Sequence, residues 1–353
     1  MLMLDDLDKI KDIDKSDMLG LLEHLPDQIE VSVNNAKKVN LTGLAGFKPT
    51  SVLVAGMGGS AISGDILRCW LAQRDNIIIE TVRNYSLPNH AKQNTLVFAC
   101  SYSGNTEETL SAVQNALENG CKIISVTSGG KLKEFSIENN IPIVEMPQGL
   151  APRAAVAFLL FPMIAVLEKM KIIKPFIELP DIINDLKTKR GTIKSTMPIE
   201  QNPAKQIAAI LSRGIPFIYG HSYLNVIAYR WKTQLNENAK VLAMSGELPE
   251  MNHNELVGWF GDNQTVAKKF IVILLRSHDE EPRIIKRLEL TKKMLKAIVS
   301  EVLEVESKGE DRLARMLTTM YLGDYVSVYL AIIRELDPTP VVPIEHFKKL
   351  MDK

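Results

Sequence analysis

The chain has 353 residues, of which 46% are hydrophobic and 24% charged, an ordinary globular composition with enough apolar material for two domains. Lysine and arginine together number 42, as do aspartate and glutamate, so the zero net charge indicates no general affinity for nucleic acid or membrane. The three cysteines are too few for a disulfide scaffold, and the first residues lack a signal-peptide pattern; both features favour a cytoplasmic protein.

Residues 1–45 are predicted to form short polar helices whose leucines contact another part of the protein. A first α/β unit is predicted over residues 46–150. The strand 51–55 enters a glycine turn ending at Gly59 and Ser60, an opening typical of a doubly wound parallel sheet. The glycine spacing fits a dinucleotide fingerprint only loosely. It indicates more simply that backbone and Ser60 can approach a small ligand. Further strands are predicted at 77–79, 95–100, 122–127 and 141–144.

The hydroxyl-rich loop Ser101–Thr109 lies between a predicted strand and a predicted helix. Ser101, Ser103 and Thr106 lie within one turn at the helix N-terminus, where free N–H groups and the helix dipole favour an anion. The loop has no P-loop lysine, so a phosphate ester is a better candidate ligand than a nucleotide. The alternative is a capping turn rich in serine and threonine.

The second half of the chain repeats this order. Residues 151–212 are predicted to be helical, starting with a long apolar helix over 151–174 in which the stretch 154–167 is too short to span a bilayer. A second α/β unit follows over residues 213–335, and a final helix over 336–353. In the second unit, Ser277–Glu281 places carboxylates where a phosphate would need donors, so a single anion site per chain is expected.

Gly58-Gly59-Ser60 together with Ser101–Thr106 resembles the sugar isomerase (SIS) domain. The stretches 151–153, 235–240, 251–255 and 337–340 extend the likeness, which covers roughly residues 50–350, to the bifunctional phosphoglucose/phosphomannose isomerases. The resemblance implies two SIS-type doubly wound parallel-sheet sandwiches with extra N- and C-terminal helices. It also implies metal- and cofactor-independent isomerisation of glucose 6-phosphate and mannose 6-phosphate to fructose 6-phosphate through a cis-enediol. The residues it suggests for phosphate binding are Gly59, Ser60, Ser101, Ser103 and Thr106.

The resemblance also supplies candidate catalytic residues. Glu237, in the stretch Asn-Glu-Asn-Ala, is the candidate base, although position alone favours a solvated glutamate at a helix end. Arg153 is the candidate for stabilising the enediolate, whereas a lone arginine opening an apolar helix is more often a surface residue.

Two further residues are candidates for opening the sugar ring. His253 suits proton transfer near neutral pH, and the resemblance implies that it is donated across a homodimer interface. Its alternatives are a capping histidine or half of a zinc site with His221, for which no third ligand is apparent. In the final helix, Lys348 borders a face of Ile344, Phe347 and Met351 that is predicted to be buried, and Lys349 is the competing lysine.

Two rival functions remain open on the residues alone. One is a non-catalytic phosphosugar-binding regulator, but residues 1–45 show no basic helix-turn-helix arm. The other is an isomerase or deaminase for a different phosphosugar, such as arabinose 5-phosphate or glucosamine 6-phosphate; the two-copy architecture with Glu237 and His253 argues against it.

Overall fold

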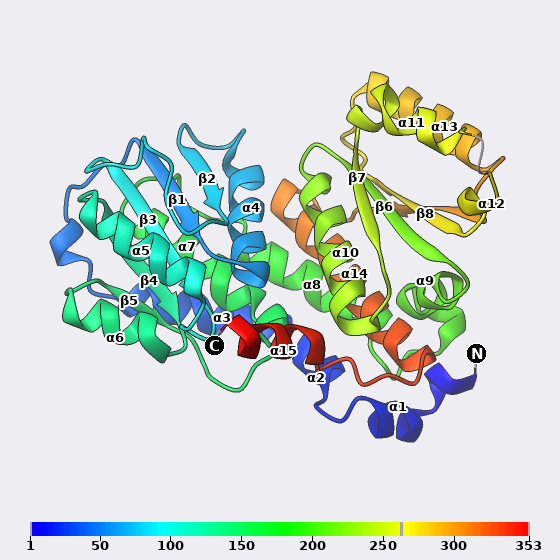
Figure 1. Ribbon diagram of the computed structural model, residues 1–353, viewed down its shortest axis with the longest axis horizontal. Helices are drawn as coiled ribbons and strands as arrows, with labels where there is room; N and C mark the ends of the chain where they lie inside the picture. Colours follow the sequence, from blue (N-terminus) through cyan, green and yellow to red (C-terminus); the bar gives the residue numbers. More distant parts are fainter. Residues whose placement is uncertain (1, 262–263, 352–353) are drawn as a thin grey trace. The chain divides into compact units, whose positions relative to one another are not determined.

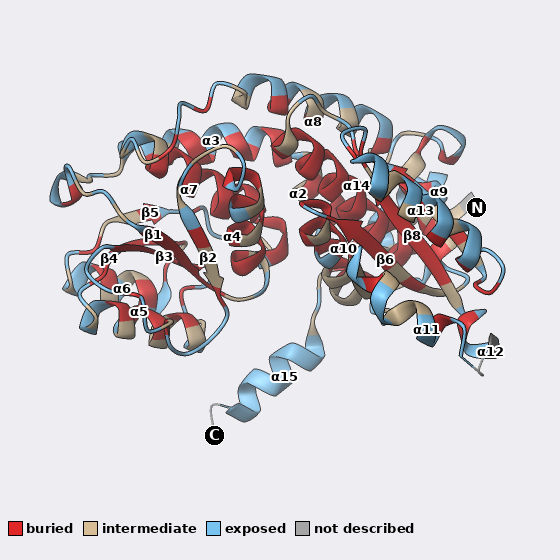
Figure 2. Ribbon diagram, turned by 90° about the horizontal axis from the view of Figure 1, so that it is seen from above, coloured by how far each residue is buried: buried red, intermediate tan, exposed pale blue. Residues whose placement is uncertain are grey.

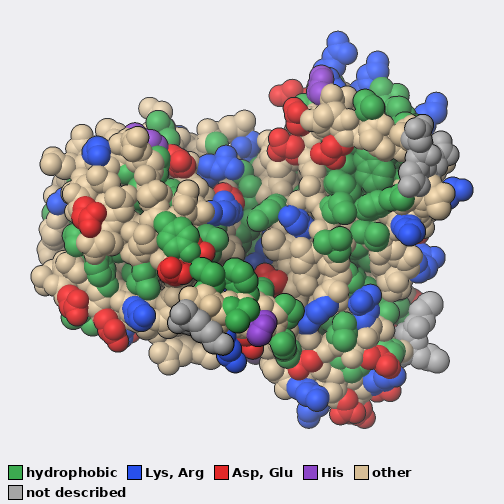
Figure 3. Space-filling model, in the orientation of Figure 1, with side chains coloured by type: hydrophobic (Ala, Val, Ile, Leu, Met, Phe, Trp, Pro, Cys, Tyr) green, Lys and Arg blue, Asp and Glu red, His purple; other side chains and the backbone are tan. Residues whose placement is uncertain are grey.

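The computed structural model describes residues 2–261 and 264–351. The chain forms two compact units. The five-stranded unit is His24–Asn184, and the four-stranded unit combines Met1–Glu23 with Asp185–Lys353. The chain passes between them within α8 (Leu179–Ile193). On the face drawn in Figure 3, acidic and basic side chains are interspersed, in keeping with the balanced composition.

The five-stranded unit contains an all-parallel sheet in the order β2-β1-β3-β4-β5 (Figure 1). Its strands are β1 (Ser51–Ala55), β2 (Ile78–Val82), β3 (Thr95–Ser101), β4 (Lys122–Thr127) and β5 (Ile143–Glu145). Its helices are α3 (Leu25–Lys38), η2 (Thr42–Leu44), α4 (Gly58–Leu71), α5 (Glu107–Glu118), α6 (Gly130–Glu138), η3 (Pro152–Ala154) and α7 (Val156–Lys169). Strands β1 and β3 are buried along their whole length, as expected for a parallel sheet covered on both faces.

The four-stranded unit contains a second parallel sheet in the order β7-β6-β8-β9. Its strands are β6 (Ile215–His221), β7 (Met244–Leu248), β8 (Phe270–Arg276) and β9 (Glu301–Glu306). Its helices are η1 (Leu2–Asp5), α1 (Leu7–Ile13), α2 (Met18–Glu23), η4 (Ile199–Gln201), α9 (Pro203–Leu211), α10 (Leu224–Ala239), η5 (Glu250–His253), α11 (Glu255–Trp259), α12 (Gln264–Ala267), α13 (Pro282–Leu295), α14 (Arg312–Ile333) and α15 (Val342–Met351).

Helix α14 is the core helix of the four-stranded unit. It is long and apolar enough to cross a membrane, but almost all of it is buried inside the protein (Figure 2). Helix α7 has the same role in the five-stranded unit, since every residue from Val156 to Leu167 is buried. Both apolar segments therefore serve as core.

The predicted fold class, two doubly wound parallel sheets with additional terminal helices, is confirmed. Some predicted elements were wrong in detail. The long helix predicted over 151–174 is split into η3 and α7, because the backbone leaves helical geometry between Arg153 and Val156. By its contacts, the chain divides after Glu23 and after Asn184; the predicted boundaries at 45, 150, 212 and 335 stay predictions.

The prediction of a buried face on the final helix was also wrong. No residue of α15 is buried, and Figure 2 shows the helix as exposed throughout. Ile344, Phe347 and Met351 are 44%, 62% and 55% exposed. Their helical spacing correctly indicates an amphipathic helix, but no other described part of the chain covers its apolar face.

Candidate functional site

The predicted phosphate-binding residues lie at the carboxyl ends of β1 and β3. The chain goes from β1 to β2 on one side and then to β3 on the other, so the β1–β3 boundary is the switch point of this sheet, where open α/β sheets bind ligands. A Cβ on Gly56 would lie 2.9 Å from both the carbonyl oxygen of Cys100 and the Cβ of Ser60. The ends of both strands and Ser60 are therefore packed together.

The loop after β3 orients its hydroxyls toward one another. Ser101 Oγ lies 2.9 Å from Thr106 Oγ1 and accepts a hydrogen bond from Gly104 N at 3.1 Å. Ser101 is buried, Thr106 is half-buried and Ser103 is exposed, so the hydroxyls lead from the sheet edge to the surface. Thr106 is the N-cap of α5 but makes no side-chain capping bond, so its hydroxyl leaves the N–H groups of the first turn uncapped.

A neighbouring glycine turn holds this loop. Gly104 and Gly130 both have positive φ, 68° and 63°. A Cβ on Gly104 would lie 1.8 Å from the carbonyl oxygen of Gly129, and one on Gly130 would lie 2.5 Å from that of Ser103. Only glycine at both positions allows the two backbones to approach this closely.

Arg153 belongs to the same cluster. A Cβ on Gly59 would lie 3.0 Å from the carbonyl oxygen of Pro152 and 3.6 Å from the Cα of Arg153, so Gly59 allows η3 to approach the start of α4. The Arg153 side chain is buried. Tyr102 connects the hydroxyl loop to the segment that leads to Arg153, because its hydroxyl donates to Pro147 O at 3.0 Å and accepts from Leu150 N at 2.7 Å.

Glu237 lies in the last turn of α10, in the four-stranded unit, and is half-buried. Both of its neighbours are fixed by side-chain hydrogen bonds. Asn236 Oδ1 accepts from Ala243 N at 2.8 Å, and the fully buried Asn238 donates from Nδ2 to Ser327 Oγ on α14 at 2.9 Å. These bonds fix the backbone on either side of Glu237.

The rest of α10 is locked to α14 by buried polar contacts. Arg230 donates from Nε and Nη2 to the two carboxylate oxygens of Asp324 at 3.1 and 3.0 Å, and both side chains are buried. Burial raises the pKa of Asp324, while the charge and hydrogen bonds of Arg230 act in the opposite direction. Trp231 Nε1 donates to Thr319 O at 2.9 Å. A rigid helix pair therefore supports the candidate base.

Lys240 connects the end of α10 to the approach to α15. It adopts a left-handed conformation with φ of 54°, and its ammonium group donates to the backbone oxygens of Asn238, Asp337 and Pro338 at 3.0, 2.9 and 2.8 Å. It therefore tethers the backbone beside Glu237 to the segment that precedes Lys348. Lys348 and Lys349 both lie on the exposed α15, so burial does not distinguish them.

His253 ends η5 and is exposed, and its side chain makes no hydrogen bond or ion pair to any other described residue. Its neighbour Asn252 donates to Thr291 Oγ1 at 2.9 Å, which anchors the turn. The alternative zinc partner, His221, is instead buried 3.3 Å from a carboxylate oxygen of Glu280. Within the described residues, no group of three or more His, Cys, Asp or Glu side chains is arranged to hold a metal.

The structure thus brings Gly59, Ser60, Ser101, Thr106 and Arg153 together in the five-stranded unit, with Ser103 at the outer end of the same loop. Glu237, His253 and Lys348 all belong to the four-stranded unit. Sequence reasoning did not identify the supporting roles of Tyr102, Asn238 and Lys240. Asn238 and Lys240 lie in the stretch 235–240 that carries the family resemblance. The helical periodicity of that stretch does not indicate that Asn238 contacts α14 or that Lys240 contacts residues 337–338.

Comparisons with known proteins match both halves of the chain. The family model described as "SIS domain" matches residues 47–156, and the model described as "Bacterial phospho-glucose isomerase C-terminal SIS domain" matches residues 200–351. A solved structure of a hypothetical protein from Thermus thermophilus shares the fold with a TM-score of 0.75 at 14% identity, covering 98% of this chain and 93% of that one.

Two curated relatives show the family. The bifunctional phosphoglucose/phosphomannose isomerase of Caldicellulosiruptor bescii is 39% identical over 333 residues, covering 94% of this chain and 98% of the relative. The protein of the same name from Thermoplasma acidophilum is 37% identical over 301 residues, covering 85% and 89%. The chain therefore belongs to the bifunctional phosphoglucose/phosphomannose isomerase family.

Proposed function

We propose that the protein interconverts glucose 6-phosphate and fructose 6-phosphate, and also mannose 6-phosphate and fructose 6-phosphate. The observation that carries this proposal is the 39% identity to a bifunctional isomerase over 94% of this chain and 98% of that relative. The hydroxyl loop at the switch point of the first sheet supports it, because that is where a phosphate ester is expected.

In this mechanism the phosphate group is anchored by Gly59, Ser60, Ser101, Ser103 and Thr106. Uncharged hydroxyl and amide donors bind a phosphate ester and still allow its release. This end of the substrate does not react, so its binding energy is used to orient C1 and C2 for proton transfer.

The reacting end requires acid–base chemistry. Lys348 and His253 assist opening of the sugar ring, with His253 at the ring oxygen. Glu237 then moves a proton between C1 and C2, and Arg153 stabilises the negative charge that develops on the enediolate oxygen. Glucose and mannose 6-phosphate differ only in configuration at C2, so they give the same enediol. One base that can act on either face of C2 therefore serves both aldoses.

This proton transfer consumes no redox cofactor, and the donors and acceptors it needs are side chains. EDTA is therefore expected to leave the rate unchanged, and a rate restored only by an added metal would contradict the mechanism. The proposal further includes a cytoplasmic homodimer in which His253 reaches the active site of the partner. The exposure of His253 is compatible with such a role.

The test is Glu237→Gln, which retains the shape of the side chain and removes the base. Formation of fructose 6-phosphate is measured by a coupled assay, separately from glucose 6-phosphate and from mannose 6-phosphate. We expect both rates to fall by about three orders of magnitude or more, while phosphosugar binding persists. Glu289→Gln is the matched control, because Glu289 is an exposed glutamate of α13 in the same unit. Activity within about tenfold of the wild type would exclude Glu237 as the base.

A further inference from the structure

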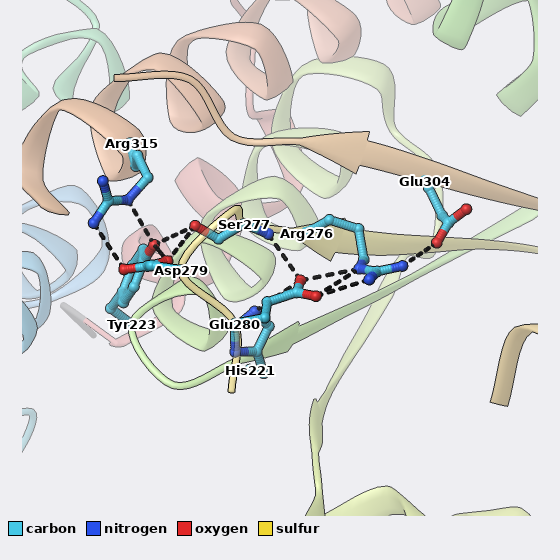
Figure 4. Close-up of polar contacts among 8 residues, drawn as sticks. All are labelled: His221, Tyr223, Arg276, Ser277, Asp279, Glu280, Glu304 and Arg315. Carbon is cyan, nitrogen blue, oxygen red and sulfur yellow. Dashed lines mark hydrogen bonds and ion pairs between the residues drawn. The ribbon is translucent and has the colours of Figure 1, made fainter. Parts of the chain in front are cut away.

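The second sheet carries a cluster of polar side chains at its own switch point, the position where open α/β sheets have a ligand crevice. The chain goes from β6 to β7 on one side and to β8 on the other, so the carboxyl ends of β6 and β8 correspond to those of β1 and β3. Tyr223, Ser277, Asp279 and Arg315 meet there (Figure 4). As expected from the sequence, the Ser277–Glu281 loop brings a carboxylate, that of Asp279, to this edge, and Tyr223 and Ser277 add two hydroxyls.

The donors in this cluster converge on one carboxylate. Tyr223 Oη lies 2.8 Å from Asp279 Oδ1, and Ser277 Oγ hydrogen-bonds the same oxygen. Arg315 Nη2 donates to the other oxygen, Oδ2, at 2.8 Å. Arg315 Nε also donates to Tyr223 Oη at 2.9 Å, which orients the phenol hydroxyl toward the carboxylate.

The donors form the buried wall, and the carboxylate is the more exposed group. Tyr223, Ser277 and Arg315 are 4%, 4% and 6% exposed, whereas the side chain of Asp279 is 33% exposed. Burial alone would raise the pKa of Asp279, but hydrogen bonds from Ser277 and Tyr223 and the charge of Arg315 outweigh it and lower that pKa. The cluster therefore stabilises an anion at this position.

The surroundings add positive potential. The guanidinium carbon of Arg312 lies 4.9 Å from the centre of the Tyr223 ring. Arg312 and Arg315 are both in the first turn of α14, a 22-residue helix whose positive dipole end lies at this terminus. Arg276, at the end of β8, is bound by Glu280 and Glu304.

We propose that this cluster is an anion-binding site that the chain fills with its own side chain. The Asp279 carboxylate occupies the position that inorganic phosphate or a phosphate monoester would take. Glu280 reinforces the closure, because its carboxylate accepts from Ser277 N at 2.8 Å and so removes a backbone donor of the same loop. Of the two equivalent sheet edges, this one excludes a sugar phosphate. The inference concerns a different place from the proposed active site and does not depend on that function.

The test is to remove the internal carboxylate and count bound phosphate. Asp279→Ala leaves Arg315, Tyr223 and Ser277 without their internal carboxylate. Equilibrium dialysis with radioactive phosphate is expected to show one more bound phosphate per chain in Asp279→Ala than in the wild type. The added site is expected to disappear in the double variant Asp279→Ala/Arg315→Met. Because the readout is a difference, it holds whether or not the wild type binds phosphate at the hydroxyl loop.

The matched control is Glu301→Ala, which frees another arginine of the same unit from its carboxylate. Arg213 pairs with Glu301 at 3.1 Å, but its side chain is 62% exposed, so no gain in phosphate binding is expected. An unchanged phosphate count in Asp279→Ala, or a gain that survives Arg315→Met, would overturn the proposal.

Thermal unfolding is a second measurement, which tests the proposal even if the variants are less stable than the wild type. Asp279→Ala and Asp279→Ser are expected to unfold at lower temperature than the wild type. Phosphate should raise their midpoints more than chloride does at equal ionic strength, and more than it raises the wild-type midpoint. If phosphate has no such excess effect on either variant, the cluster is an ordinary ion pair and the inference fails.

Discussion

Helices α10 and α14 pack so closely at Gly323 that one added methyl group is expected to destabilise the protein. Gly323 on α14 faces the ring of Trp231 on α10, and a Cβ at position 323 would lie 2.1 Å from Nε1 and 2.3 Å from Cε2 of that ring. Trp231 is completely buried, and its Nε1 donates to Thr319 O at 2.9 Å. The ring can move away only by giving up that hydrogen bond.

The substitution Gly323→Ala sets two opposing effects against each other. Alanine favours a helix interior over glycine by about 1 kcal/mol. Overpacking costs about 1–3 kcal/mol, and a buried N–H that loses its acceptor costs about 1–3 kcal/mol more. The net expectation is a free energy of unfolding lowered by about 1–5 kcal/mol, a large part of the total stability of a typical domain.

Urea unfolding measures this change, with Gly191→Ala as the control. Gly191 also lies inside a helix, α8, but a Cβ there would meet no atom within 4 Å, so only the favourable helix propensity applies. We expect Gly191→Ala to be neutral or stabilising by up to about 1 kcal/mol. A change in Gly323→Ala that matches the control, or stays within about 0.5 kcal/mol of the wild type, would refute the close contact.

Two further predictions concern the support of Glu237 and the effect of pH. Asn238→Ala removes the hydrogen bond to Ser327 and is expected to lower kcat about 10- to 100-fold in the coupled assay, because the proposed base Glu237 loses its fixed position. An unchanged kcat would refute this positioning role. Burial of Glu280 would by itself raise its pKa, but the contact with His221 and hydrogen bonds from Arg276 and Ser277 N lower that pKa to about 2, from 4.5. Its contribution to stability is therefore complete above about pH 4.5 and lost as the pH falls toward 2. The free energy of unfolding should fall less between about pH 5 and pH 3 in Glu280→Gln than in the wild type, and an equal fall would contradict the assignment.

Much of the fold follows from local patterns in the sequence. A buried parallel strand is a continuous apolar run, which makes β1, β3 and β4 predictable. The loops after β1 and β3 are predictable as well, because glycines and hydroxyl residues follow those apolar runs directly. In the structure, Ser60, Ser101 and Thr106 lie at one edge of this sheet, because the carboxyl ends of the adjacent parallel strands β1 and β3 coincide. The roles of Glu237 and Lys348 came from family resemblance, because a glutamate at a helix end or a lysine on an amphipathic helix has no distinctive local pattern.

By itself, then, the sequence determined the two parallel sheets, the amphipathic character of α15 and the loop suited to phosphate. Only the tertiary structure decided which apolar faces are covered: the face of α15 is exposed, although its periodicity matches that of a buried helix. Only the tertiary structure brought Arg315 to Tyr223, 92 residues earlier in the chain, and with it the carboxylate of Asp279. The physical reason is that periodicity specifies which side of an element is apolar. The packing of β6, β8 and α14 specifies which polar side chains share an edge.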